Sequence, residues 1–308
     1  MKILLNQPYS FCQLGSRDNQ EDSRYPDADV PHGFDPFFMV CDGVGGCDKG
    51  EVASKTVCEA FAHSLAHMEW DSVFTTADFK IALSSAYTAL GKKTKDENRG
   101  MATTLTFAAF HQGGCTVAHM GDSRIYHIRP KVGILYRSDD HSLVNALVHS
   151  GNLSPEEAIN HPDSNIITRY ISVPEPGVER PDATVMLLKD ISAGDYFFLC
   201  SDGVLHRLSD EALVDVLSSN LSDKDMIDTI ARLCASSEDN NTAILIPIKE
   251  VLSKEQDLDE LDGPGKEIEG SETFPFSQEQ EQARDISSDV PTKLKTKIYN
   301  IFKHLFFS

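Results

Sequence analysis

The sequence has no apolar run long enough to cross a membrane as a helix. No stretch approaches the ~20 apolar residues that such a helix needs, and the N-terminal run MKILLNQPYSF is too short for a signal peptide. The seven cysteines include no Cys-x-x-Cys pair, and most of them lie within apolar runs. We therefore expect reduced thiols in the core of a cytoplasmic protein.

Two known signatures of phosphate chemistry are also absent. The chain contains no Walker phosphate-binding loop, so nucleotide hydrolysis of that type is not indicated. The cysteine-phosphatase arrangement, in which an arginine lies six positions after a cysteine, does not occur either. Neither of these two chemistries is therefore expected.

Positive charge is scarce. The 308 residues include 28 Lys and Arg against 48 Asp and Glu, which gives a formal net charge of −20. Binding to DNA or RNA is not expected, because it needs clustered Lys and Arg side chains. The negative balance is compatible with sites for metal cations, since acidic side chains are common ligands of these ions. A chain of this length can form one large domain or two modest ones.

Strand-like and helix-like patterns alternate along residues 1–250, which we expect to form one folded domain. Runs rich in β-branched and aromatic residues predict strands at 37–41, 103–110, 115–120, 124–128, 196–200 and 242–248. Helices are predicted at 51–67, 77–95, 211–218 and 224–236. This alternation by itself favours a parallel, doubly wound sheet.

The composition changes after residue 250. Residues 254–290 hold twelve acidic and three basic side chains and almost no aliphatic ones, which predicts a disordered acidic linker over 251–290. Residues 291–308 carry four lysines and no acids, and their apolar side chains share one face at helical spacing. We interpret this segment as a basic amphipathic helix that packs on its own domain, binds peripherally to the inner membrane surface, or docks a partner protein.

Two apolar runs end in an Asp-Gly pair. FFMVCDGVGG, residues 37–46, places Asp42 and Gly43 directly after a predicted strand, and YFFLCSDGV, residues 196–204, repeats the pattern at Asp202. Each pair taken alone is most simply a tight turn. A glycine after the aspartate can also let a backbone carbonyl turn toward a bound ion.

Further carboxylates lie near the ends of other predicted elements. Glu21 and Asp22 lie side by side, four residues after Arg17. Asp122 lies between two strand-like runs, and Asp239 shortly precedes the last predicted strand. Carboxylates at strand ends can converge at one edge of a sheet, where they would repel each other unless cations lay between them. Oxygen ligands of this kind are those that Mg²⁺ and Mn²⁺ prefer.

In their order along the chain, these segments resemble the metal-dependent serine/threonine protein phosphatases of type 2C. The matching motifs are Arg-x-x-x-Glu-Asp at 17–22, Asp-Gly-x-Gly-Gly at 42–46, Gly-Met-Ala-Thr-Thr at 100–104, Gly-Asp-Ser-Arg at 121–124, Asp-His-Ser-Leu at 140–143, Ser-Asp-Gly at 201–203 and Asp-Asn-x-Thr at 239–242. A segment at 165–169 is also similar to the family. One such motif is weak, but seven in this order over residues 10–248 are highly specific.

The resemblance implies an α+β fold, a four-layer α-β-β-α sandwich of two mainly antiparallel sheets flanked by helices, in place of the parallel sheet. It implies Mn²⁺ or Mg²⁺ as cofactor, with two ions per site and a weaker third. The residues that would hold the two ions, directly or through water, are Glu21, Asp42, Gly43 (through its carbonyl), Asp202 and Asp239. By the same resemblance, Asp22 holds metal-bound water, Asp122 is a ligand of the third ion, and Arg17 binds phosphate.

The implied reaction is hydrolysis of phosphoserine and phosphothreonine in proteins by a water that two metal ions activate. The substrates would be phosphoproteins, and a cognate Ser/Thr kinase would oppose the enzyme. Some relatives have a histidine proton donor where this chain has Val44, so the proton donor stays open, with a water near Asp122 as our candidate. Two alternatives remain: a phosphoprotein-binding pseudophosphatase, which only Val44 supports, and a phosphatase of small phosphate esters.

Overall fold

A computed structural model describes residues 1–27, 35–44, 49–93, 100–158, 161–174 and 177–252. The predicted helix at 291–308 and all of the predicted acidic linker beyond residue 252 lie outside the described residues, as do Gly45 and Gly46. No helix among the described residues is both long enough and apolar enough to span a membrane.

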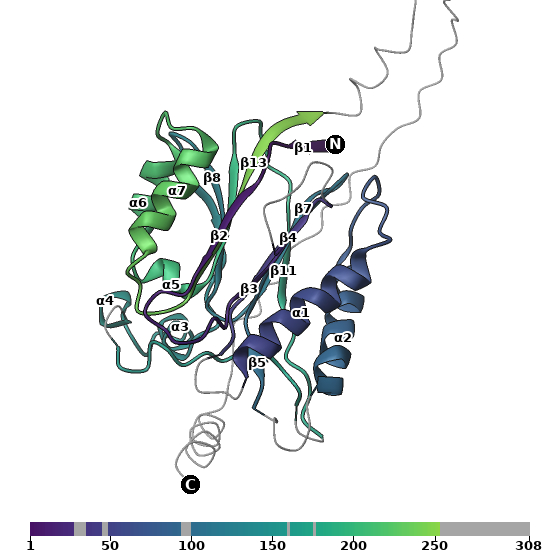
Figure 1. The fold of residues 1–308 in the computed structure, drawn as a ribbon, viewed down its shortest axis with the longest axis vertical. Coiled ribbons are helices and arrows are strands. Elements are labelled where there is room, and N and C mark those ends of the chain that lie inside the picture. Colours follow the sequence, from purple (N-terminus) through teal and green to yellow (C-terminus); the bar gives the residue numbers. More distant parts are fainter. Residues whose placement is uncertain (28–34, 45–48, 94–99, 159–160, 175–176, 253–308) are drawn as a thin grey trace, which may run out of the picture. The chain divides into compact units, whose positions relative to one another are not determined.

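Two antiparallel sheets face each other in the middle of the molecule (Figure 1). The first has the order β1-β13-β12-β8-β9, and β2 also pairs with β13. Its strands are β1 (Lys2–Leu5), β2 (Tyr9–Gln13), β8 (Arg124–Arg129), β9 (Gly133–Arg137), β12 (Tyr196–Cys200) and β13 (Asn241–Leu252). The second has the order β11-β7-β6-β4-β3. Its strands are β3 (Ser23–Tyr25), β4 (Phe37–Cys41), β6 (Leu105–His111), β7 (Gly114–Met120) and β11 (Thr184–Leu188). A small pair, β5 (Ala102–Thr103) and β10 (Ile171–Ser172), lies apart from both sheets.

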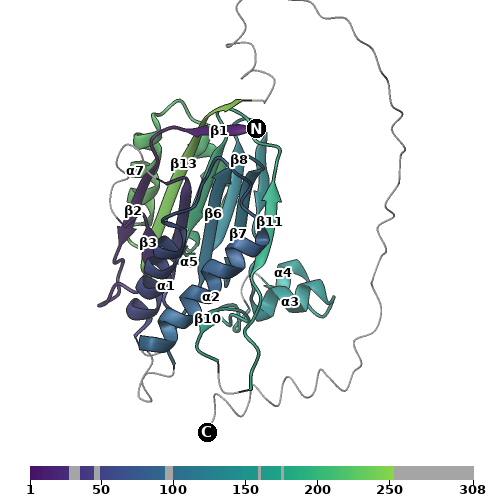
Figure 2. The ribbon, with the colours of Figure 1, turned by 90° about the vertical axis from the view of Figure 1, so that its right-hand side faces the viewer.

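Helices cover the outer face of each sheet. The helices α1 (Gly50–Leu65) and α2 (Thr76–Lys93) pack on the second sheet, as Figure 2 shows. The helices α5 (Asp202–Leu205), α6 (Asp210–Leu217) and α7 (Asp223–Cys234) pack on the first. Two short helices, α3 (Leu143–His149) and α4 (Pro155–Ala158), lie together near one end of the sandwich. The expected four-layer α-β-β-α sandwich is confirmed, and every strand pair in the described residues is antiparallel.

Side-chain alternation along the central strands separates three apolar layers. In β4, Phe37 and Met39 join the layer beneath α1 and α2, whereas Phe38 and Val40 join the layer between the sheets. Neighbouring side chains of a strand point to opposite faces, and here both faces are covered. Such strands are apolar throughout instead of alternating, which is also the pattern of a parallel sheet. The parallel sheet that alternation alone favoured is therefore wrong, and the hydrophobic pattern could not have excluded it.

The predicted elements agree with the structure at their centres. β4 and β12 match the predicted strands residue by residue, and the four predicted helices begin within a residue of α1, α2, α6 and α7. The strand predicted at 103–110 is divided at Thr104, because the Thr104 N–H donates to the Asp42 carbonyl (2.8 Å) and the Thr104 hydroxyl accepts from the Asp42 N–H (3.0 Å). The six described cysteines are free thiols, and five of them are buried, as expected.

Asp195 anchors the far end of the first sheet through a buried network. Its carboxylate accepts hydrogen bonds from the guanidinium of Arg129 (2.8 and 3.0 Å) and from the Ser192 N–H (2.8 Å), and it contacts His127 Nε2 at 2.9 Å. Burial by itself raises the pKa of the Asp195 carboxyl, but these hydrogen bonds outweigh it and leave the pKa lowered. Asp190, which is exposed and binds Arg129, is the other charged group at this network.

We predict that Asp195→Asn lowers the free energy of unfolding by about 3 kcal/mol at pH 7, because it leaves buried donors without their charged acceptor. A lowered folded-state pKa stabilises the protein above the usual Asp pKa of about 3.9, and the contribution is lost as the pH falls through the folded-state value. Urea unfolding of wild type and variant at several pH values should show the difference shrinking below about pH 4. An equal difference at pH 7 and pH 3 would contradict the network's electrostatic role.

Candidate metal and phosphate site

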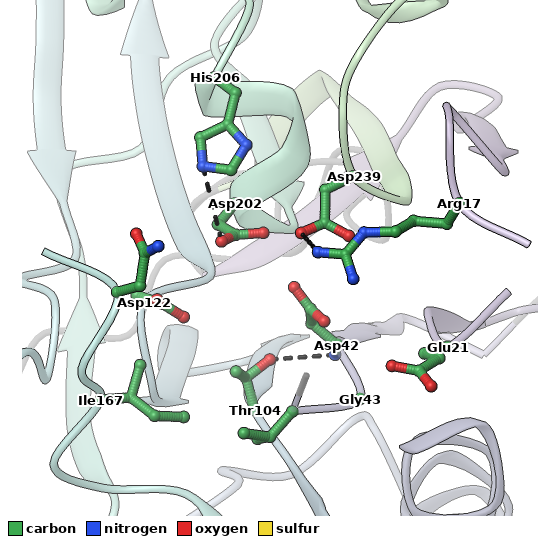
Figure 3. A pocket seen from close by; sticks show the side chains of 12 residues that line it. Arg17, Glu21, Asp42, Gly43, Thr104, Asp122, Ile167, Asp202, His206 and Asp239 are labelled. Atoms are coloured by element: carbon green, nitrogen blue, oxygen red, sulfur yellow. Dashed lines mark hydrogen bonds and ion pairs between the residues drawn. The ribbon is translucent and has the colours of Figure 1, made fainter. Parts of the chain in front are cut away.

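One pocket gathers the carboxylates that the sequence placed at strand ends. Asp42 follows β4, Asp122 follows β7, Asp202 begins α5 after β12, and Asp239 lies shortly before β13. Figure 3 shows these side chains facing a common space, with Arg17 and Glu21 on one side of it. The pocket has a volume of about 270 Å³ and is lined by Arg17, Glu21, Asp42, Gly43, Val44, Thr104, Asp122, Asn165, Ile167, Asp202, His206 and Asp239. All the predicted site residues except Asp22 therefore line one pocket.

The Asp-Gly pair at 202–203 is not a tight turn, because it forms the first turn of α5. Gly203 is required there, since a Cβ on it would lie 1.9 Å from the Asn240 carbonyl oxygen and 3.3 Å from the Asp239 Cβ. Gly43 is similarly close to α1, because its Cβ would lie 2.5 Å from the Gly50 carbonyl carbon. Both glycines thus allow segments that are distant in sequence to meet at the pocket.

Asn240 holds the N-terminal loop that carries Arg17 and Glu21. Its side-chain oxygen accepts from the Glu21 N–H (2.8 Å), and its side-chain nitrogen donates to the Leu14 and Asn19 carbonyls (2.9 and 3.0 Å). Asn240 is only 4 % exposed, so water competes little for these hydrogen bonds. Asn240 directly follows Asp239. These hydrogen bonds therefore hold the loop of Arg17 and Glu21 next to the Asp239 carboxylate.

The Glu21 carbonyl is fixed from the opposite side. It accepts from the Ser54 hydroxyl of α1 (2.6 Å) and from the Gly43 N–H (3.1 Å). Asn240 belongs to the layer of the first sheet, and Ser54 and Gly43 belong to the layer of the second. The backbone of Glu21 therefore bridges the two layers at the pocket.

Asp22 lies beneath the pocket instead of lining it. It is 5 % exposed, and its Oδ2 accepts from the Ser201 hydroxyl (2.8 Å), which in turn accepts from the Thr242 N–H (3.0 Å). Ser201 is the residue before Asp202, so this hydrogen bond ties Asp22 to the start of α5. Its position makes Asp22 a support for the carboxylates that line the pocket.

Arg17 reaches the acidic side of the pocket from its exposed loop. Its Nη2 donates to Asp239 Oδ2 (2.7 Å), and its Nε donates to the Glu238 carbonyl oxygen (3.3 Å). The Arg17 side chain is 49 % exposed, so the guanidinium stays accessible to a ligand in the pocket. Among the residues that line the pocket, Arg17 is the one permanent positive charge.

The gathered carboxylates raise one another's pKa values. Burial raises the pKa of Asp42 well above its usual range, and the charges of Asp22, Asp202 and Asp122 raise it further. Burial and the charge of Asp202 raise the pKa of Asp122 to about 7. For Asp22, burial raises the pKa to about 7 against the hydrogen bond from Ser201, which lowers it. Such a group of acids is a poor site for an anion alone and a good one for cations.

The donor set fits divalent cations that prefer oxygen. Carboxylates dominate the pocket lining, and Gly43 can add a backbone carbonyl. No three or more His, Cys, Asp or Glu side chains of the described residues are already arranged around one metal position. Mg²⁺ commonly keeps several waters and binds through only one or two carboxylates, so a dispersed set of acids is suitable for such ions.

Several residues of the site stand within the sequence motifs but were given no role from sequence. Thr104 accepts from the backbone N–H of Asp42, 62 positions away. Ser201 donates to the side chain of Asp22, 179 positions away. Asn240 accepts from the backbone N–H of Glu21, 219 positions away. No local pattern indicates such contacts. His206, which lines the pocket, has one local signal: it follows Asp202 by four residues, which brings both side chains to one face of a helical turn.

Comparisons with known proteins show the family of this chain. Residues 20–245 match the family model described as protein phosphatase 2C. The chain belongs to this family. As a member it is a metal-dependent serine/threonine protein phosphatase, as the sequence motifs predicted.

Individual relatives are similar over most of their length. The protein phosphatase PhpP of Streptococcus pneumoniae is 33 % identical over 220 residues, which cover 70 % of this chain and 86 % of PhpP. The crystal structure of the serine/threonine phosphatase PstP of Mycobacterium tuberculosis has a TM-score of 0.68 at 28 % identity, covering 80 % of this chain and all of that one. A structure of the PstP catalytic domain in complex with two manganese ions has a TM-score of 0.66 at 26 % identity, covering 81 % of this chain and all of that one.

We predict that Gly203→Ala separates Asp202 from Asp239, because its Cβ would overlap the Asn240 carbonyl oxygen. Overpacking of this kind costs about 1–3 kcal/mol, and each kcal/mol lowers the melting temperature by about 2–4 °C in a domain of this size. Phosphatase activity should fall together with the melting temperature. Gly91→Ala is the matched control, because a Cβ there meets no atom within 4 Å. Unchanged stability and activity in Gly203→Ala would show that the close packing is not needed.

Proposed function

We propose that this chain hydrolyses phosphoserine and phosphothreonine esters in proteins at the described pocket, with two Mn²⁺ or Mg²⁺ ions bound there and a weaker third. The observation that carries this proposal is the convergence of the carboxylates and Arg17 on one pocket. When bound, the ions activate a water for in-line attack on phosphorus and neutralise charge on the phosphate. The alternative of a phosphoprotein-binding pseudophosphatase predicts the same fold with this chemistry lost.

The residues of the pocket divide into ion ligands and supports. We assign the two principal ions to Glu21, Asp42, Asp202, Asp239 and the Gly43 carbonyl, directly or through water. Asp122 belongs to the third ion. Asp22 lies below, where its hydrogen bond with Ser201 supports a role in orienting bound water. The raised pKa of Asp42 supports this assignment, because bound cations would relieve the repulsion that causes it.

Arg17 is assigned to the phosphate. Its planar guanidinium can bind two phosphate oxygens at once, and its hydrogen bond with Asp239 holds it at the edge of the ion ligands. A phosphate held by Arg17 would lie beside the carboxylates that would hold the ions. Val44 lines the same pocket and has no proton to donate, so the proton of the leaving alkoxide must come from another group.

The proposal also covers the cellular compartment and the binding partners of the enzyme. We infer that it opposes a Ser/Thr kinase in the cytoplasm, since a protein phosphatase needs phosphorylated substrates. The basic segment at 291–308 gives the chain a further place to bind a partner or an anionic membrane surface. The excess of acids over bases in residues 1–252 would equally attract this segment to its own domain.

We predict that a phosphothreonine peptide and p-nitrophenyl phosphate are hydrolysed with Mn²⁺, and that EDTA stops both reactions. Asp42→Asn and Asp239→Asn should lose activity while circular dichroism shows the fold intact. Added Mn²⁺ should raise the melting temperature of wild type, since ligand at about 100 times its Kd stabilises by about 2.7 kcal/mol, and raise it less in the variants.

The same assay separates the rival functions. Turnover that EDTA does not affect would contradict the metal assignment. Binding of the peptide without turnover under any metal would indicate the pseudophosphatase. Turnover of p-nitrophenyl phosphate alone would indicate a phosphatase of small esters.

We predict that Arg17→Lys raises KM for the peptide and the inhibition constant of inorganic phosphate by roughly 10- to 100-fold, the equivalent of a charge-assisted hydrogen bond of about 1.5–3 kcal/mol. Lysine keeps the charge but lacks the planar fork, so kcat should change less than KM. Arg232→Lys on the exposed face of α7 is the control. Equal phosphate inhibition of wild type and Arg17→Lys would exclude Arg17 from phosphate binding.

We predict that removing residues 291–308 reduces binding to vesicles of anionic lipid or changes the activity of the enzyme. Reduced vesicle binding at unchanged activity identifies the membrane as the target. Changed activity without vesicles identifies contact with the catalytic domain. A truncated chain with unchanged vesicle binding and activity would leave only the docking of a partner protein.

A further inference from the structure

His206 lies at the pocket without a role in the proposed reaction. It is the residue after the last turn of α5 and follows Asp202 by four positions. Its side chain is 47 % exposed, and it lines the pocket together with Asp122 and Asp202. Figure 3 shows its imidazole turned toward the Asp202 carboxylate.

The helical turn places His206 beside Asp202, and few other contacts hold its ring. Among the residues that the structure describes, the one polar contact of the imidazole is with Asp202, where Nε2 lies 3.8 Å from Oδ2. That distance is too long for a hydrogen bond. The ring is also absent from the three apolar layers. A surface histidine in an ordinary ion pair is the simplest alternative.

The two side chains are close enough to reach one ion after a change of the His206 rotamer. Ligand atoms about 2.1 Å from an octahedral ion lie about 3.0 Å apart when adjacent and about 4.2 Å apart when opposite. The 3.8 Å between His206 Nε2 and Asp202 Oδ2 matches neither value, so the imidazole has to move toward Asp202 to take an adjacent position. Because the ring is exposed and lies at the end of a helix, a small rotation can bring it to an ion beside Asp202.

We propose that His206 is an additional ligand of the weaker third ion, that this ion is held by Asp122 together with Asp202, which it shares with a principal ion, and that His206 shifts this site from Mg²⁺ toward Mn²⁺ and related transition ions. The proposal rests on the proposed function, because it takes Asp202 and Asp122 as ion ligands. Mg²⁺ is satisfied by oxygen ligands and gives up water reluctantly. An imidazole nitrogen is instead a common ligand of first-row transition ions.

The direct test is pulsed electron paramagnetic resonance of the full chain, stripped of metal and then loaded with Mn²⁺ alone. Every other ligand that we assign is an oxygen, and His206 is the one histidine among the pocket residues of the described chain. Wild type should therefore show ¹⁴N coupling from an imidazole to Mn²⁺. His206→Ala should lose the coupling, and the exposed His63→Ala on α1 should keep it.

A second measurement tests selectivity without activity. Calorimetric titration with Mn²⁺ or Mg²⁺ alone should show the weakest Mn²⁺ site lose affinity by at least about tenfold in His206→Ala, since even the loss of a residue that supports a ligand costs 10- to 100-fold. The Mg²⁺ affinity should change much less. His206→Gln keeps the size of the side chain but offers no imidazole, so it should behave as His206→Ala does.

Three results would overturn the assignment: no ¹⁴N coupling in wild type, equal coupling in His206→Ala, or a lower kcat in His206→Ala at unchanged Mn²⁺ affinity. The last would mean that His206 acts on the substrate. A chain that binds no Mn²⁺ and hydrolyses its substrate in EDTA would overturn the proposed function as well. If activity depends on Mn²⁺ as proposed but wild type and His206→Ala bind Mn²⁺ with the same affinity, only the present inference is overturned.

Discussion

Repulsion among carboxylates is the constraint on which the site depends. Asp42, Asp202 and Asp122 face one pocket, with Asp22 beneath them, and each raises the cost of charging another. A fold can hold such a group only if the surrounding packing is stable enough to outweigh the repulsion. Three apolar layers supply that stability here. Two lie between a sheet and its helices, and the third lies between the two sheets. Bound cations would relieve this repulsion, and the relief would add to the free energy of cation binding.

The frame around these carboxylates is made of hydrogen bonds with uncharged side chains. Thr104 holds the backbone of Asp42, Ser201 holds the side chain of Asp22, and Asn240 holds the backbone of Glu21. Each of the three is buried, so its hydrogen bonds are protected from competition with water. The Thr104 and Asn240 contacts are with backbone N–H groups, which carry no titrating charge. The backbones of Asp42 and Glu21 are therefore fixed independently of the charge of the pocket, which favours preorganisation for hydrolysis.

The central elements of the fold could be predicted from sequence, and their arrangement could not. β4 and β12 are readable because both of their faces are buried and their residues are apolar throughout. The same property conceals strand direction, since a strand covered on both sides looks alike in parallel and antiparallel sheets. β2 and β3 carry no continuous apolar run, and the apolar runs of β1, β9 and β11 are short and lie on partly exposed strands, so none of the five was predicted. The antiparallel sandwich followed from the motifs, whose order along the chain is specific.

The site divides in the same way between residues to which the motifs give a role and residues to which they give none. Arg17, Glu21, Asp42, Asp122, Asp202 and Asp239 could be named because the motifs carry them, and all of them line the pocket. Val44 and His206 line it too, and no motif explains either one. Val44 places an apolar side chain on one wall of the pocket, whereas His206 places a nitrogen one helical turn from the Asp202 carboxylate. The carboxylates can therefore define the reaction, while these two residues adjust which ion serves it and where the leaving group finds its proton.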